Sequence, residues 1–211
     1  MTTYLDYGRF AATPLETDPY HHIVVPQFVH PERFEDVLAD FPDIRTPGSI
    51  PPSELDIRGR FAELMEEMSG DGFREAVEGK FGVDLAGRPT MYTVRGRCRR
   101  TDGRIHTDSE TKIITVLLYL NRQWEDGGGR LRILRSGNRL DDYASEVPPH
   151  GGTLLIFRRA PNSWHGHEPF EGERRAIQLN WVTSQAVVDR EQRRHRVSAL
   201  FKTLNPFGSA A

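Results

Sequence analysis

The sequence predicts a mainly β protein with flanking helices, and two observations lead to this fold class. Between Pro89 and Ser184, short β-rich runs alternate with turns rich in glycine and charge, which is typical of an all-β sandwich or barrel. Before and after that region, apolar residues recur at helical spacing instead. We find no internal repeat and no domain boundary. We therefore expect one domain over residues 1–211, with a helical flank at about 31–82, a β core at about 89–183 and a C-terminal helix at about 186–204.

The helical flank follows a short apolar strand, Ile23–Val25. Pro31 suits the first turn of a helix, because its fixed φ matches the helix and its missing N–H is not needed there. Three apolar stripes at helical spacing then predict three helices, which we expect to cover a sheet. The stripes are Phe34, Val37, Leu38 and Phe41, then Phe61, Leu64, Met65 and Met68, and finally Phe73, Ala76, Val77 and Phe81.

Five β-rich runs form the predicted core: Thr90–Arg95, Ile113–Leu120, Arg130–Leu134, Thr153–Phe157 and Arg174–Val182. Side chains alternate along a strand, so the second and the last run can be assigned faces. One face of the second run is aliphatic and belongs against helices: Ile114, Val116, Leu118 and Leu120. Its other face suits a pocket: Ile113, Thr115, Leu117 and Tyr119. One face of the last run is polar, as expected of either a pocket wall or a solvent-exposed surface: Arg174, Ala176, Gln178 and Asn180.

Composition excludes several classes of protein. The net charge is −2, from 28 basic and 30 acidic residues, so no bulk charge favours nucleic acid or a membrane surface. The single cysteine, Cys98, rules out an intramolecular disulfide. Residues 1–20 contain no apolar core between a basic start and a small-residue cleavage site, so we expect no secretory leader, and no apolar run reaches the ~20 residues that a bilayer-spanning helix needs. We expect a cytoplasmic protein that binds neither nucleic acid nor membrane.

The histidines carry the strongest chemical signal. In His106-Thr107-Asp108, a histidine and a carboxylate two residues apart can bind the same side of a metal ion. One further histidine would complete a facial triad, the arrangement that leaves coordination positions of a non-haem iron open. Either His165 or His167 can supply it, and an arginine, Arg174, follows on the next predicted strand. The other histidines are assigned to surface, capping or loop positions: His21, His22, His30, His150 and His195.

With these residues in place, the chain resembles the iron(II)- and 2-oxoglutarate-dependent dioxygenases, specifically their prolyl-hydroxylase-like branch. The resemblance runs from about Met91 to Val182, and its elements recur in order at compatible spacings. They are His106-x-Asp108, Leu118–Asn121 with Trp124, Gly128–Ile133, Pro149–Leu154 with Phe157, His165-x-His167-x-Pro169, Arg174, and Ile177 with Trp181.

The resemblance implies a double-stranded β-helix (jelly roll) core, with Fe(II) as cofactor and 2-oxoglutarate as co-substrate. His106, Asp108 and His165 would bind the iron. His165 is favoured over His167, because the family's ligand precedes a position that is usually valine, with a proline two residues further on. Arg174 would hold the distal carboxylate of 2-oxoglutarate through two parallel hydrogen bonds, and Tyr119 would donate another. Arg175 is the less favoured alternative, because its strand face is bulky and aliphatic.

The implied reaction consumes dioxygen and 2-oxoglutarate, hydroxylates an unactivated C–H bond and releases succinate and carbon dioxide. The substrate, a small molecule or a peptidyl side chain, stays open, as does the oligomeric state. A basic stretch, Arg95–Arg104, suits an anionic substrate, and a solvated loop is the alternative. The family's pocket-lining tyrosine corresponds to Tyr92 or Val94. Two rival functions are a cupin-like metal-binding jelly roll, acting as an isomerase or a sugar-binding module, and a catalytically silent member that binds a partner.

Overall fold

The computed structural model describes residues 3–191 and residue 193. Its helices are α1 (Tyr7–Ala12), α2 (Pro31–Ala39), the 3₁₀ helix η1 (Pro52–Glu54), α3 (Gly59–Ser69) and α4 (Asp71–Phe81). Its strands are β1 (His22–Val25), β2 (Thr90–Cys98), β3 (Lys112–Tyr119), β4 (Leu131–Leu134), β5 (Tyr143–Val147), β6 (Leu154–Arg158), β7 (His165–Gly166) and β8 (Gly172–Val182). Residues 185–191 are helical, and the rest of the predicted C-terminal helix lies almost wholly outside the described residues.

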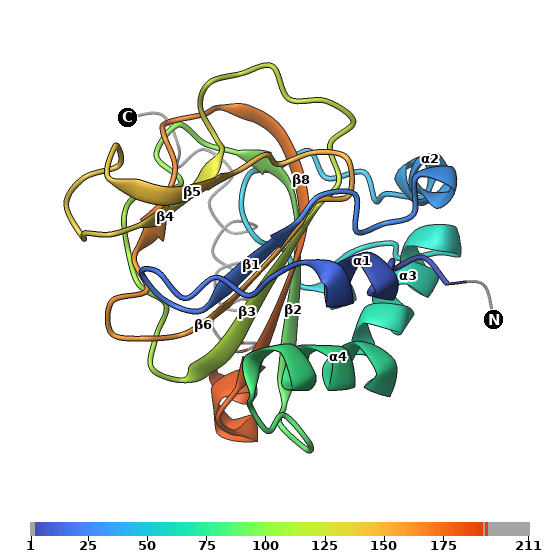
Figure 1. Cartoon of the computed structure of the whole chain (residues 1–211). Coiled ribbons are helices and arrows are strands. Elements are labelled where there is room, and N and C mark those ends of the chain that lie inside the picture. The colour runs from blue at the N-terminus through green and yellow to red at the C-terminus, as the bar shows by residue number, and fades with distance from the viewer. Residues whose placement is uncertain (1–2, 192, 194–211) are drawn as a thin grey trace.

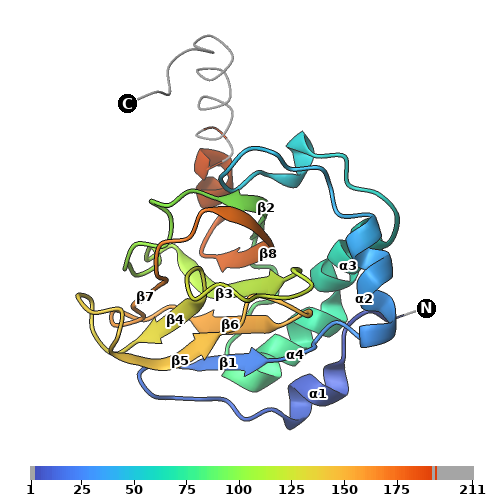
Figure 2. The ribbon, with the colours of Figure 1, turned by 90° about the horizontal axis from the view of Figure 1, so that it is seen from above.

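The strands form two sheets. The larger has the order β1-β6-β3-β8-β2 and the smaller the order β5-β4-β7, with antiparallel neighbours throughout. Helices α2 to α4 lie on one side of the large sheet and the small sheet lies on its other side (Figures 1 and 2). The prediction of a mainly β fold with flanking helices and a jelly-roll core is therefore confirmed. No helix in the described part of the chain is long and apolar enough to cross a bilayer.

The helices form because each presents one apolar stripe to the sheet. Helix α2 begins at Pro31, and α4 is followed by Gly82, whose φ of 60° is favourable for glycine. The predicted stripes pack into one core with the aliphatic face of β3, where Ile114, Val116 and Leu118 are fully buried, and only Phe41 and Ala76 of the stripes stay partly exposed. Burying each such side chain contributes about 1.5–3 kcal/mol to stability. The expected contact between helices and sheet is thus confirmed.

A second core fills the space between the two sheets. It contains the inward side chains Tyr119, Leu155, Phe157 and Ala176 together with residues of the small sheet. Arg174 and Asn180 are buried on the same side, so the polar face of β8 is a wall of the interior. The alternative of a solvent-exposed face is wrong.

One side chain of β3 does not follow the simple alternation. Ile113 was expected on the inward face, but it packs against the helix-side core. The β3–β8 ladder shifts register between Lys112 and Ile114, and such a bulge adds a residue that reverses the alternation locally. As a result, Lys112 faces the interior between the sheets, where the candidate site lies.

Candidate functional site

The fold brings His106, Asp108 and His165 together. One ligand atom from each residue lies within 4.8 Å of the other two. His106 and His165 exchange two backbone hydrogen bonds of 3.0 Å, which join the loop before β3 to β7. Two imidazoles and one carboxylate at this spacing fit a divalent metal ion bound from one side.

Hydrogen bonds fix both histidine rings so that Nε2 is available. Nδ1–H of His106 donates to the carbonyl of Arg104 at 2.8 Å, and Nδ1–H of His165 donates to the carbonyl of Ser163 at 2.9 Å. Metal-binding histidines typically donate the N–H of the ring nitrogen that does not bind the metal, here Nδ1, to such a carbonyl. His22 makes the same kind of Nδ1 bond, but its Nε2 is already bonded to a serine hydroxyl at 3.0 Å. Burial lowers the pKa of His165 to about 4, so its ring is neutral at neutral pH.

Asp108 is buried and held at both carboxylate oxygens. Oδ1 accepts from Lys112 Nζ at 2.6 Å, and Oδ2 accepts from the Thr115 hydroxyl at 2.5 Å. Asn180 Nδ2 donates to the Thr115 oxygen at 2.8 Å, and Gln178 donates to Asn180 at 3.1 Å. Burial alone raises the pKa of Asp108, but the charge of Lys112 and the hydrogen bonds from Lys112 and Thr115 outweigh it, so the pKa is lowered. The carboxylate is therefore ionised and oriented.

A cavity of about 250 Å³ lies beside these three residues, between the two sheets. Three cationic side chains line it, from Arg95, Lys112 and Arg174, and Asp108 is the one acidic residue among its described lining. Leu117, Leu131 and Ala176 form its apolar part. We call it the inner cavity. Its charge favours a small anion in contact with the histidines and Asp108.

Arg174 is the cavity arginine that the sequence predicted. It is buried, and its Nε donates to the Gly129 carbonyl at 2.8 Å while Nη2 donates to the Tyr119 hydroxyl at 3.2 Å. Among the described residues, Nη1 has no hydrogen-bond partner. Arg175 points to the opposite side of β8, where its guanidinium lies 5.1 Å from the Phe41 ring centroid. Of the two arginines, only Arg174 lines the inner cavity.

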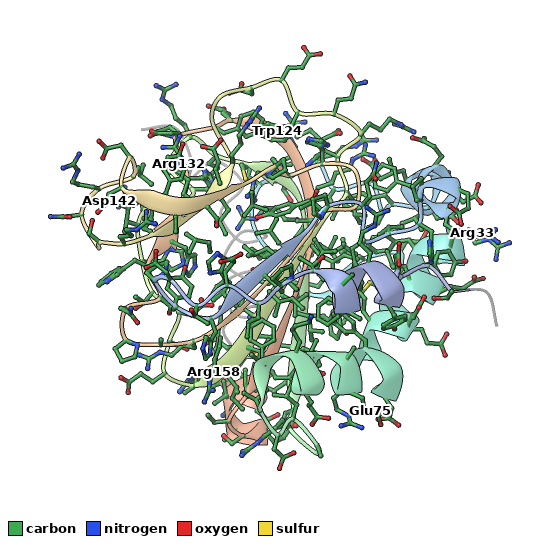
Figure 3. The ribbon with its side chains drawn as sticks, viewed as in Figure 1. Arg33, Glu75, Trp124, Arg132, Asp142 and Arg158 are labelled. Atoms are coloured by element: carbon green, nitrogen blue, oxygen red, sulfur yellow. The ribbon has the colours of Figure 1, made fainter. Side chains whose placement is uncertain are left out.

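Glycine is required at position 129 for this arrangement. Gly129 has a φ of +73°, and an added Cβ would lie 2.7 Å from Trp124 and 3.0 Å from Phe170. In Figure 3, Trp124 lies on a loop at the end of the molecule far from α4, which carries Glu75. The close approach of these rings holds the Gly129 carbonyl against Arg174.

Tyr119 contacts Arg174 but does not itself line the inner cavity. The tyrosine is fully buried, its hydroxyl accepts from Arg174, and burial raises its pKa. It is absent from the described lining of the inner cavity, so its contact in this structure is with the guanidinium. The predicted hydrogen bond from Tyr119 to a co-substrate stays a prediction.

The strand before His106 differs from expectation. The Tyr92 hydroxyl is hydrogen-bonded to that of Ser69 on the helix side, and Val94 is buried in the helix-side core, so neither lines the inner cavity. Thr93 and Arg95 line it instead. Residues of the opposite strand phase face the inner cavity, so neither Tyr92 nor Val94 takes a pocket position there, whereas Tyr92 lines the larger cleft described below.

Arg95 is the residue of the basic stretch that reaches the site. Its Nη1 donates to Asp102 at 2.8 Å and its Nη2 to the Ser49 hydroxyl at 3.1 Å. The other arginines of the stretch are exposed and make no ion pair within the described chain: Arg97, Arg99, Arg100 and Arg104. Strand alternation favours Arg95 as an inward residue, although the sequence did not fix the strand's register.

His167 lines the inner cavity but is not part of the three-residue group. It is buried, and its Nδ1–H donates to the Glu168 carbonyl at 2.8 Å. Burial, followed by the charge of Arg174, lowers its pKa to about 4. Its ring is therefore uncharged at neutral pH and forms part of the cavity wall.

A larger cleft of about 860 Å³ adjoins the inner cavity at His106 and Asp108. Its walls are the loop Ser49–Glu54, the β2 segment Thr90–Thr93 and the helix at residues 185–191. We call it the outer cleft. His106, Asp108, Lys112 and Gln178 line both spaces, so the three-residue group lies where they meet.

Comparisons with known proteins agree with this geometry. Residues 95–183 match the sequence model of the 2OG-Fe(II) oxygenase superfamily. This stretch contains the three-residue group and Arg174. The resemblance predicted from the motifs is confirmed by this match. Members of this superfamily use Fe(II) and 2-oxoglutarate, and the His-Asp-His group with its cation-lined cavity fits both.

Two solved structures share the fold. A prolyl 4-hydroxylase of Pseudomonas putida aligns with a TM-score of 0.50 and 18% identity, over 84% of this chain and 97% of that one. A prolyl 4-hydroxylase of Phytophthora capsici aligns with a TM-score of 0.58 and 15% identity, over 88% of this chain and 68% of that one. Curated protein sequences give no match. At these identities the two structures establish the jelly-roll fold alone.

Proposed function

We propose that the protein is an iron(II)- and 2-oxoglutarate-dependent dioxygenase that hydroxylates an unactivated C–H bond of a small molecule or a peptidyl side chain. Dioxygen and 2-oxoglutarate would be consumed, and succinate and carbon dioxide released. The observation that carries this proposal is the position of His106, Asp108 and His165 beside a small cation-lined cavity, with His106 and Asp108 also lining a larger cleft. Co-substrate and substrate can then approach the metal from different sides.

His106 and His165 would bind the iron through Nε2, and Asp108 through a carboxylate oxygen. The iron, once bound, supplies the oxidising chemistry that no protein side chain can provide. The chain's own task is to orient these ligands. The carbonyls of Arg104 and Ser163 fix the two rings, and Thr115 fixes the carboxylate.

Arg174 and Arg95 would hold 2-oxoglutarate in the inner cavity. A guanidinium binds a carboxylate well because its planar N–H groups match the two oxygens. Arg174 is already held by Gly129 and Tyr119, so little side-chain freedom remains to be lost when a carboxylate binds at Nη1. The apolar part of the cavity would exclude water from the carbon chain between the two carboxylates.

The test is a binding and turnover measurement on protein purified under low oxygen. We expect the wild type to bind Fe(II) and 2-oxoglutarate and to form succinate once oxygen is admitted, and His106→Ala to lose iron binding and succinate formation. His21→Ala is the matched control, because that histidine makes no side-chain contact with the site. A wild type that binds neither iron nor 2-oxoglutarate at micromolar concentrations would refute the proposal.

A further inference from the structure

Strand β2 forms an open edge of the large sheet. It pairs with β8 on one side, and the N–H and C=O groups of alternate residues point to opposite edges in such a ladder. Val94 uses its outward groups to pair with Ile50, through bonds of 2.8 and 2.9 Å. Val182 N–H bonds to Pro89 C=O at 2.9 Å on the β8 side, in agreement with this alternation. The outward N–H and C=O groups further along are therefore those of Tyr92 and Thr90.

The chain itself pairs with this edge at Ile50, and η1 then stays beside β2 without pairing with it. Ile50 is followed by Pro51 and Pro52, which have no backbone N–H to donate, and the chain turns into η1. Within the described residues, no strand lies opposite Thr90 and Tyr92, and no backbone hydrogen bond to their outward groups is made. An unpaired edge of this kind is a template for a further strand.

The open edge faces the candidate site. Thr90–Thr93 line the outer cleft together with His106 and Asp108. Thr93 lines the inner cavity as well, so the inward face of β2 leads directly to the metal-binding residues. Alternate side chains of a strand added beside β2 would point the same way.

Polar side chains of the outer cleft can hydrogen-bond to a peptide backbone. Here hydroxyl side chains recur around the cleft, from Ser49, Ser53, Thr90, Thr93, Thr107, Ser109 and Thr111. The loop Ser49–Glu54 and the helix at residues 185–191 line the same cleft as this edge, so an extended chain paired with β2 would lie in that cleft.

We infer that the substrate is an extended peptide segment that adds a strand to β2 at Thr90 and Tyr92 and presents one of its side chains to the metal site. This inference rests on the proposed function and narrows it. Affinity would come from backbone hydrogen bonds and selectivity from the alternate side chains, as in other cases of strand addition.

The first test uses the iron- and 2-oxoglutarate-loaded protein. The probe is a library of unmodified linear nonapeptides of random sequence. The control is the matching mixture of free amino acids. The measured quantity is succinate formation above the rate without a probe. The most active peptide is then resynthesised with one backbone N–H methylated at a time. We expect methylation at alternate residues to weaken binding about tenfold through lost hydrogen bonds, and methylation between them to have little effect.

The second test changes the protein. The N–H of Thr90 points away from β8, so Thr90→Pro removes a cleft-facing donor and leaves the ladder intact, whereas Thr90→Val keeps the donor. We expect peptide binding to weaken about five- to tenfold in Thr90→Pro and to stay near the wild-type value in Thr90→Val. Melting curves check that both variants fold. In the wild type, which needs no folding control, added peptide should slow hydrogen exchange of the Tyr92 amide.

The outcomes separate this inference from the proposed function. Turnover raised by free amino acids but by no peptide would overturn the inference, as would methylation effects without alternation. A dimer of the chain that Thr90→Pro dissociates would also overturn it, in favour of a second copy at the edge. If the protein binds neither iron nor 2-oxoglutarate, the proposed function fails instead.

Discussion

The inner cavity and the outer cleft meet at His106 and Asp108 but are built from different parts of the chain. Sheet strands and the short connections beside them wall the inner cavity, and hydrogen bonds already fix its polar groups, as they do for Arg174 and Asp108. The outer cleft is walled largely by a proline-containing loop, a helix and a sheet edge with unpaired backbone groups. Under the proposed function, the co-substrate would bind among strand residues whose side chains are already held by hydrogen bonds, while substrate choice would depend on the loop, helix and sheet edge around the outer cleft.

The largest effect is expected from His165, the buried histidine of the three-residue group. Removing a hydrogen-bond partner of a metal ligand already costs 10–100-fold in affinity, so His165→Ala should lower Fe(II) affinity by at least ~100-fold. Anaerobic titration with Fe(II) measures this. His167→Ala is the matched control, since that ring lines the same cavity outside the three-residue group, and it should keep most of the affinity. A reversed order would assign the third ligand to His167.

Next in size is the loss of the guanidinium fork. Arg174→Lys keeps the charge but loses the two parallel hydrogen bonds, and we expect 2-oxoglutarate to bind roughly 30-fold more weakly. Calorimetry on the iron-loaded protein measures this, with Arg175→Lys as the control on the opposite side of the strand. Activity that survives Arg174→Lys without any change in 2-oxoglutarate affinity would favour the cupin-like alternative.

A smaller effect is expected from the residue that orients the carboxylate. Thr115→Val removes the hydroxyl that donates to Asp108 and that accepts from Asn180. We expect iron affinity to fall about tenfold. Thr111→Val, a threonine nearby without a bond to Asp108, should leave iron affinity as it is. Equal affinities in the two variants would show that Thr115 does not position the ligand.

The smallest effect is expected at the outer cleft. Glu54→Gln removes an exposed charge on η1, and solvent screening should keep Fe(II) and 2-oxoglutarate affinities within about twofold of the wild type. The KM for the substrate should change instead. A several-fold loss of 2-oxoglutarate affinity would contradict the separation of the two spaces.

Local sequence rules were sufficient for much of the fold and the site. The three stripes of the helical flank and the aliphatic face of β3 follow from periodicity, which depends on neighbouring residues alone. Strand phase likewise distinguishes Arg174 from Arg175, because consecutive side chains of one strand point to opposite faces. The triad became recognisable because His106, Asp108 and His165 recur in the order and spacing of a known family.

Features set by tertiary pairing were not predictable in this way. The bulge beside Lys112 moved Ile113 out of the site, and it arises from the β3–β8 ladder rather than from local propensity. Strand β7 has two residues and exists only because β4 lies beside it. The inward position of Arg95 likewise depended on a register that one strand alone does not specify.

The central claim is that the metal and 2-oxoglutarate bind side by side at the junction of the two spaces. The most direct measurement is the anaerobic calorimetric titration of 2-oxoglutarate into the wild type with and without Fe(II). We predict binding at least about tenfold tighter with iron present, because the co-substrate would contact the metal as well as Arg174. Equal affinity with and without iron would contradict the account.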